Sequence, residues 1–276
     1  HNYFAPSGAY ARGKGFNIVP DATNYGFTVG EMRNTIIEDI GAATDNNANN
    51  SPYGVSKGIS MSIPGNGFAN IYLDNVTIKN IYGDDAEGIY TRPYSNTGYN
   101  YATNRFTLHI ENSKFIACQR RALKLNASNA VIKNNYFETA SNAPIFSGAQ
   151  AAYVHIFSYV DGQALDDVTM TGNTISVVGE SKNQVFAMTE VDNLLIDNNV
   201  FSVNRNHAGA TLGFGNSTRG ATGNYSGDVG GGVVFTNNTI NNAKIVVGGL
   251  YNTSGNGPTI SGNTFNYDNV GGENIG

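Results

Sequence analysis

The sequence predicts an all-β protein whose backbone winds as a parallel β-helix of about eight coils. Three observations lead to this prediction: a short motif recurs along the chain, asparagine stands at most of its bends, and short alternating apolar runs flank each bend. The composition agrees, because only 13% of the 276 residues are charged while 34 residues are glycine. Coiled coils, helical bundles and collagen-like chains need other compositions, and 40% hydrophobic residues argue against disorder.

One short motif organises the chain. The motif has six positions: an apolar residue, any residue, Asn or Gly, a residue that is often Asn, any residue, and a second apolar residue. Its eight copies begin at positions 32, 73, 110, 132, 170, 196, 235 and 260. The shortest interval between copies, 22 residues, is long enough for three short strands and three turns, so the longer intervals indicate the same coil with inserted loops. Asn suits a sharp bend because it tolerates left-handed backbone, and stacked coils would align the Asn side chains in a hydrogen-bonded column.

Two other repeat architectures fit less well. Leucine-rich repeats need a denser leucine framework, and propeller blades need near-constant spacing with antiparallel hairpin turns. We therefore expect a single domain over residues 1–276, with residues 1–26 as an N-terminal extension or an incomplete first coil and residues 27–276 as coils. The chain begins without a leader-like segment, so we expect a mature or excised piece.

These coils resemble the right-handed single-stranded parallel β-helices of the pectate-lyase-like superfamily, and the Asn-, Gly- and Tyr-rich loops are similar to those of phage tailspike depolymerases. The resemblance implies a polysaccharide substrate, an extracellular or virion-surface location and, for a tailspike, a homotrimer. Subfamily signatures are missing: there is no Gly-His-Gly, and Asp84 with Asp85 is the only partial match to the polygalacturonase set. The Gly-Asp-Gly-Xaa-Xaa-Asp-Asp opening common in tailspike helices is also missing, which suggests that an upstream segment is left out or absent.

A third apolar strand is expected between successive motif copies, often entered through Gly or another small residue. These runs are 58–63, 88–92, 122–126, 143–147, 185–189, 210–214 and 244–248. Alternation predicts that one set of their side chains faces outward: Ser60, Ser62, Tyr90, Arg92, Lys124, Asn126, Phe146, Ala187, Thr211 and Gly213. Because neighbouring strands lie about 4.8 Å apart, Tyr90 and Lys124 should lie side by side.

Charged turns precede two of these strands, at 83–87 and 118–121, and their side chains can lean over the same outer face. The predicted catalytic cluster consists of Asp84, Asp85, Glu87, Tyr90, Arg92, Arg120 and Lys124. Residues 79–133 also hold eight of the 16 basic residues and only four acidic ones, which would favour an anionic substrate.

Long excursions at 42–57, 93–104, 148–166 and 215–231 would flank this face and form a groove. Aromatic rings in such a groove suit the apolar faces of sugars. The predicted substrate-binding residues are Tyr94, Tyr99, Tyr101, Asn126, Phe146 and His155.

Two cleavage chemistries are compatible with the cluster. Elimination of a uronic-acid glycan needs a cation on the carboxylate (Arg92 or Arg120), a base (Lys124) and an acid (Tyr90). Hydrolysis needs two carboxyl groups, for which Asp84, Asp85 and Glu87 are the candidates. We favour elimination slightly, because the basic cluster is denser than any carboxylate pair. A solvated stripe of ion pairs and an Asx-type turn explain the same residues without catalysis.

Several further expectations follow from the residues. The same three carboxylates make Ca²⁺ conceivable, but we expect no cofactor and no metal site. A net charge of −5 gives no reason to bind nucleic acid, and no stretch approaches the about 20 apolar residues of a membrane span. A non-catalytic glycan-binding adhesin or structural spike and a uronate epimerase are the alternatives outside glycan cleavage.

Overall fold

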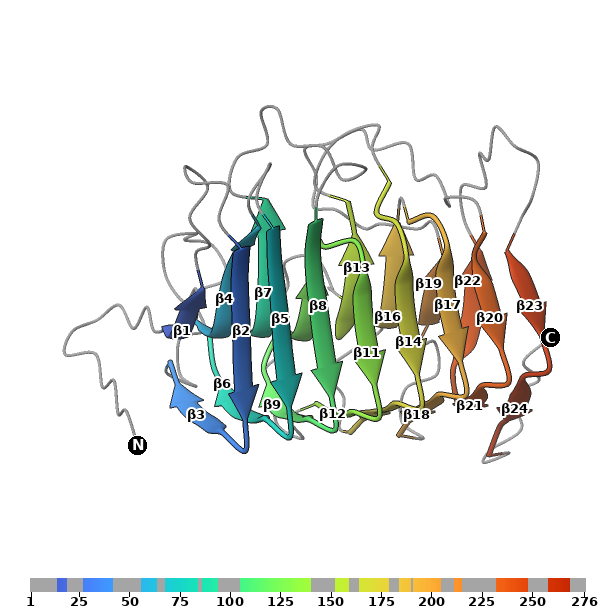
Figure 1. The fold of residues 1–276 in the computed structure, drawn as a ribbon. Helices are drawn as coiled ribbons and strands as arrows, with labels where there is room; N and C mark the ends of the chain where they lie inside the picture. Colours follow the sequence, from blue (N-terminus) through green and yellow to red (C-terminus); the bar gives the residue numbers. More distant parts are fainter. Residues whose placement is uncertain are drawn as a thin grey trace, which may run out of the picture.

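The chain forms a right-handed parallel β-helix of about eight coils, as the sequence predicts (Figure 1). The computed structural model describes residues 14–18, 27–41, 56–63, 68–83, 86–93, 105–139, 152–158, 164–178, 184–189, 191–204, 211–214, 232–247 and 258–268. Within these residues there are 24 strands in three parallel sheets of eight, and no helix. The same residues therefore contain no helix able to cross a membrane.

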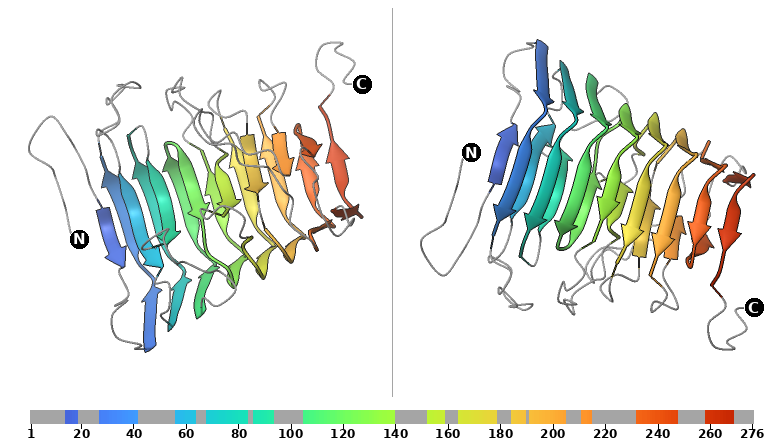
Figure 2. Two further views of the ribbon diagram at one scale, coloured as in Figure 1. Left: turned by 90° about the horizontal axis from the view of Figure 1, so that it is seen from above. Right: turned by 90° about the horizontal axis from the view of Figure 1, so that it is seen from below.

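Each coil contributes one strand to each sheet. Sheet A contains β1 (Lys14–Ile18), β4 (Lys57–Ile63), β7 (Glu87–Pro93), β10 (Arg121–Leu125), β13 (Val154–Phe157), β16 (Gln184–Thr189), β19 (Thr211–Phe214) and β22 (Lys244–Val247). Sheet B contains β2 (Phe27–Arg33), β5 (Phe68–Asp74), β8 (Arg105–Glu111), β11 (Ala130–Lys133), β14 (Val168–Thr171), β17 (Leu194–Asp197), β20 (Val234–Thr236) and β23 (Thr259–Ser261). Sheet C contains β3 (Ile36–Ile40), β6 (Thr77–Ile81), β9 (Lys114–Cys118), β12 (Tyr136–Glu138), β15 (Thr174–Val177), β18 (Val200–Val203), β21 (Thr239–Asn241) and β24 (Thr264–Asn266). Figure 2 shows the coils following one another along the axis, with equivalent strands side by side.

The recurring motif forms the bend between sheet B and sheet C. Its third residue has left-handed backbone, with φ between 49° and 66° at Asn34, Asn75, Asn112, Asn134, Gly172, Asn198, Asn237 and Gly262. Its fourth residue is, in five successive coils, an asparagine that points into the solenoid: Asn135, Asn173, Asn199, Asn238 and Asn263. The Nδ2 of each of the first four donates to the Oδ1 of the next asparagine at 2.9–3.0 Å, which confirms the predicted column. The buried amides satisfy one another and the bend backbone, so they are tolerated in an apolar interior.

Inward apolar side chains form one continuous core between the sheets. Ile59, Ile89 and Leu123 are fully buried, as alternation in sheet A predicts. In sheet C the rings of Phe115 and Phe137 stack with centroids 4.7 Å apart. Each coil covers the apolar interior of the next, so the core is buried by the stacking of coils along the axis.

Small residues at the start of the sheet A strands are required by close packing between coils. A Cβ atom on Gly58 would lie 2.6 Å from the Gly88 carbonyl oxygen, and one on Gly88 would lie 2.5 Å from the Ala122 carbonyl oxygen. The same Cβ positions point toward core side chains, so Gly58 faces inward as its neighbour Ile59 does. This break in alternation leaves the preceding residue of each strand on the outer face of sheet A.

One predicted strand is wrong. The sequence predicts that 143–147 pairs between 122–126 and 185–189, but β13 takes that place, with His155 in register with Lys124 and Ala187. Residues 143–147 lie outside the described residues. Pro144 has no N–H for a sheet ladder, whereas 154–157 alternates without interruption. His155 therefore lies in the sheet, and not on the excursion that the sequence predicts for 148–166.

Candidate functional site

Charged residues are distributed unevenly among the three sheets. The described strands of sheet A contain one carboxylate, Glu87, and six Lys or Arg residues: Lys14, Lys57, Arg92, Arg121, Lys124 and Lys244. The strands of sheet B contain three basic and four acidic residues, and those of sheet C contain two basic and three acidic residues. Sheet A is therefore the cationic sheet of a chain with a net charge of −5.

Glu87 lies at the centre of these cations. It is the first residue of β7, in register with Lys57 of β4 and Arg121 of β10. Lys57 Nζ lies 2.5 Å from Glu87 Oε2, Arg121 Nη1 donates to Glu87 Oε1 at 2.8 Å, and Lys124 Nζ lies 3.5 Å from the same oxygen. We call Lys57, Glu87, Tyr90, Arg121 and Lys124 the Glu87 cluster.

The charged groups of this cluster are almost completely removed from solvent. The exposed fraction of the side chain is 0% for Glu87, 1% for Lys57, 9% for Arg121 and 11% for Lys124. A charge at such depth is stable only when it is paired, and both oxygens of Glu87 face cations. Glu87 is thus held as a counter-ion by three adjacent coils.

Tyr90 lies under two ammonium groups. Lys57 Nζ is 5.0 Å and Lys124 Nζ is 4.7 Å from the centroid of its ring, within the range of cation–π attraction. Tyr90 and Lys124 are in register on adjacent strands, so the prediction that they lie side by side is confirmed. Tyr90 is only half-buried, so part of the residue is accessible to solvent.

His155 extends this row by one coil. It is in register with Lys124, is only 7% exposed, and stacks on Phe157 with ring centroids 4.2 Å apart. Lys124 Nζ also lies 5.8 Å from the centroid of the Phe157 ring. The outer face of sheet A therefore brings Tyr90, Lys124 and an imidazole from three successive strands into one row.

The two remaining arginine candidates differ in position. Arg92 lies in β7 in register with Ser62, on the same face as Tyr90, and its side chain is exposed. Arg120 lies in the turn before β10, half-buried, where its backbone N–H donates to the Ala86 carbonyl at 3.2 Å. Of the two, only Arg92 lies in the sheet itself.

Asn126 has a structural position. It is fully buried, its Nδ2 donates to the Thr91 carbonyl at 2.7 Å, and its backbone N–H donates to Thr91 Oγ1 at 2.7 Å. The side chain therefore ties two coils together where the sequence predicts a contact with a ligand. The turn after β10 ends the alternation from which that prediction was made.

Six predicted site residues lie outside the described residues, and for them the expectations stay predictions: Asp84, Asp85, Tyr94, Tyr99, Tyr101 and Phe146. Of the three carboxylates proposed for hydrolysis or for Ca²⁺, the structure thus describes only Glu87. Among the described residues, no group of three or more His, Cys, Asp or Glu could hold a metal ion.

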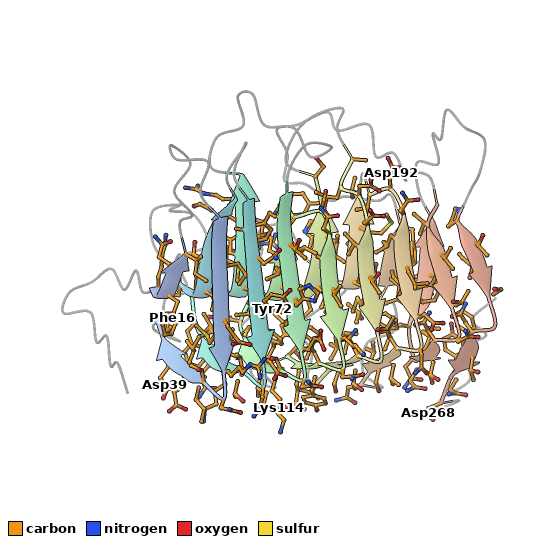
Figure 3. The ribbon with its side chains drawn as sticks, viewed as in Figure 1. Phe16, Asp39, Tyr72, Lys114, Asp192 and Asp268 are labelled. Atoms are coloured by element: carbon orange, nitrogen blue, oxygen red, sulfur yellow. The ribbon has the colours of Figure 1, made fainter. Side chains whose placement is uncertain are left out.

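Lys57, Arg121 and Phe157 were not among the predicted site residues. A positional signal was present: Lys57, Glu87 and Arg121 are each the first residue of a sheet A strand, and each stands immediately before a small residue. Phe157 stands two residues after His155 in an alternating run, and so shares its face. A second aromatic pair belongs to sheet B: Tyr72, labelled in Figure 3, is in register with His109, and their ring centroids lie 4.5 Å apart.

No protein-family model, curated protein or solved structure matches this chain. The assignment of the fold therefore rests on strand order and register. The function has to be argued from the chemistry of sheet A.

Proposed function

We propose that the protein binds an extended acidic polysaccharide across the outer face of sheet A and cleaves it by β-elimination. The observation that carries the proposal is the concentration of six Lys or Arg residues against one carboxylate in this sheet of an acidic protein. A cationic face attracts an anionic ligand and raises its local concentration. Membership of the pectate-lyase-like superfamily, and an extracellular or virion-surface role, belong to the same proposal and are supported by the likeness of fold.

The row on sheet A contains groups for each step of an elimination. Arg92 is exposed beside Tyr90 and would neutralise the uronate carboxylate, which stabilises the charge that develops when the α-proton leaves. Lys124 would accept that proton in its neutral amine form, which the proton converts to ammonium, and Tyr90 would donate its phenol proton to the leaving oxygen. His155 is a second candidate for the base, because an imidazole nitrogen can accept a proton and the residue lies in register with Lys124.

Hydrolysis is less well supported by the described residues. Glu87 has no exposed side-chain surface, and both of its oxygens face cations. A carboxylate held in this way is a poor proton donor and a poor nucleophile. A hydrolase would have to use Asp84 and Asp85, and a uronate epimerase would share the proton abstraction proposed for sheet A.

A non-catalytic glycan-binding adhesin or structural spike is the second candidate. The burial of Lys57 and Glu87 favours it, because a buried ion-pair network can serve packing alone. In that case the cationic face would bind a glycan or hold the coils together without catalysing a reaction.

The test is a screen of acidic polysaccharides with three readouts: ultraviolet absorbance of unsaturated uronate, reducing ends, and uronate composition. Elimination predicts unsaturated products, and Tyr90→Phe should lower kcat by about a hundredfold or more. Tyr72→Phe, on the outer face of sheet B, is the matched control and should leave kcat unchanged.

The other outcomes identify the alternatives. Reducing ends without unsaturated product would replace elimination by hydrolysis, and changed composition without shortening would indicate epimerisation. Binding without any product would support the adhesin. Absence of binding to every acidic polysaccharide would refute the proposal.

A further inference from the structure

A second group of cations lies at the N-terminal end of sheet A. Lys14 stands in β1, the first strand of the sheet, and Arg92 stands near the end of β7. β1, β4 and β7 are consecutive in the sheet, and β10 with Lys124 follows. Three strand spacings therefore separate Lys14 from Lys124, about 14 Å along the solenoid axis.

The register brings Lys14 and Arg92 toward the same part of the outer face. Lys14 Nζ donates to Asn17 Oδ1 at 3.3 Å, so the ammonium group is drawn along β1 toward Asn17. Asn17 is in register with Ser60, and Ser60 is in register with Tyr90. Arg92 lies two residues beyond Tyr90, which places its side chain on the same face, next to the level that the Lys14 ammonium reaches.

These two cations are not neutralised within the part of the chain that the structure describes. Neither Lys14 nor Arg92 forms an ion pair with a described carboxylate, and the one carboxylate of the sheet A strands, Glu87, is engaged by Lys57, Arg121 and Lys124. Partial burial, the Arg92 guanidinium and the Lys57 ammonium together lower the pKa of Lys14. The two positive charges repel each other in the free protein, and an anion bound between them would offset that repulsion.

We propose that Lys14 forms a second anion subsite, which extends the site of Arg92 toward β1 and binds a second uronate carboxylate of the polysaccharide chain whose first carboxylate Arg92 neutralises. The ligand class is therefore a polyanion with acid groups repeated along the chain, lying across β1 to β10. This inference rests on the proposed function for the identity of the ligand as a glycan. Because two subsites would hold one chain, long oligouronates should bind more tightly than short ones.

The test compares the affinity of short and long oligouronates, measured by calorimetry, for the wild type and for the double variant Lys14→Gln with Arg92→Gln. We expect the double variant to bind long oligouronates about tenfold more weakly, since two exposed ionic contacts are lost. Short oligouronates should bind to Lys14→Gln with unchanged affinity, because Arg92, Tyr90 and Lys124 are intact in that variant. The variant Lys14→Gln alone isolates the distal contact, and it should reduce only the advantage of long chains.

A matched control removes the same number of charges elsewhere. Lys114→Gln, on sheet C, combined with Lys133→Gln, on sheet B, should leave the length dependence unchanged. Inorganic sulfate is the second probe: in the wild type it should shift the NMR signal of the Arg92 guanidinium Nε–H, and this shift should weaken in Lys14→Gln.

The outcomes separate the subsite from the proposed function. If oligouronates bind and the length dependence survives in Lys14→Gln and in the double variant, the subsite is refuted and the function stands. If sulfate shifts the Arg92 signal in a Lys14-dependent way but no oligouronate binds, the subsite stands as an anion site and the glycan function fails. If sulfate leaves Arg92 unmoved and the control pair weakens binding as much as the double variant does, the contacts are unspecific and the subsite is refuted.

Discussion

Replacing Glu87 by Gln should destabilise the protein strongly. The variant keeps the shape of the side chain but removes the one negative charge that Lys57 Nζ contacts at 2.5 Å and Arg121 Nη1 at 2.8 Å. Removing one partner of a buried ion pair leaves an uncompensated charge at a cost of about 3–5 kcal/mol. At about 2–4 °C per kcal/mol for a chain of this size, the melting temperature should fall by roughly 6–20 °C.

The measurement is thermal and urea unfolding followed by circular dichroism, with Glu38→Gln as the control. Glu38 pairs with Lys79 Nζ at 2.6 Å, but their side chains are 34% and 39% exposed. Exposed pairs are screened by water and salt, so the control should melt close to the wild type. Equal stability of the two variants would refute the reasoning that burial makes the Glu87 pairs essential. Lys57→Met combined with Glu87→Leu should recover part of the loss, because it removes a buried charge of each sign.

Two further predictions concern the core. Asn173→Ala should lower the free energy of unfolding by about 2–4 kcal/mol in urea, because it removes the acceptor of the buried Asn135 N–H and three side-chain donations. Asn237→Gly, at the exposed left-handed position, should change that free energy little. Equal decreases in the two variants would contradict the stabilising role of the asparagine column. Burial raises the pKa of the Cys118 thiol and of the Tyr153 phenol, so the folded protein holds these protons more tightly than the unfolded chain does. Stability from this source is complete below pH 9.0, the ordinary thiol value, and is lost progressively as pH rises from there, and from the ordinary phenol value of 10.0, toward the raised pKa values of the folded protein. The melting temperature of the wild type should fall over that range, and that of Cys118→Ala should fall less steeply. A melting temperature of the wild type that does not change with pH would show that folding raises neither pKa.

The bends of the solenoid could be predicted because their chemistry is local. Asn198 and Asn199 show why: the first adopts φ 54°, which Asn tolerates, and the second buries its amide in the column. Both requirements are met within one motif, so each copy in the sequence marks a bend. Gly172 replaces the first asparagine without change of conformation, because glycine adopts the same backbone freely.

The choice of strand in sheet A could not be predicted in the same way. Both 143–147 and 154–157 are short apolar runs, and Pro144 weakens the first run without excluding it, because proline is tolerated at an edge or at the start of a strand. The decision depends on pairing with β10 and β16, which are distant in the sequence. For the same reason His155 was expected on a loop, although it lies beside Lys124.

The burial of the Glu87 cluster was equally inaccessible from the sequence. Glu87 and Arg121 read as charged turn residues, and turns are usually solvated. Close contact between Gly58, Gly88 and Ala122 breaks the alternation at the start of each strand and turns the preceding charged residue onto the outer face. There Lys57, Glu87 and Arg121 meet because successive coils stack in register.

The sequence by itself determined that this chain winds in parallel coils, since the conformation of each bend depends only on the few residues that form it. It also determined that Tyr90 and Lys124 would be neighbours, because the two strands carry the same apolar alternation. Only the tertiary structure decided which charges are buried and paired, and which segment completes the row with an imidazole. Those features depend on the register between coils separated by loops of unequal length, and no local rule specifies that register.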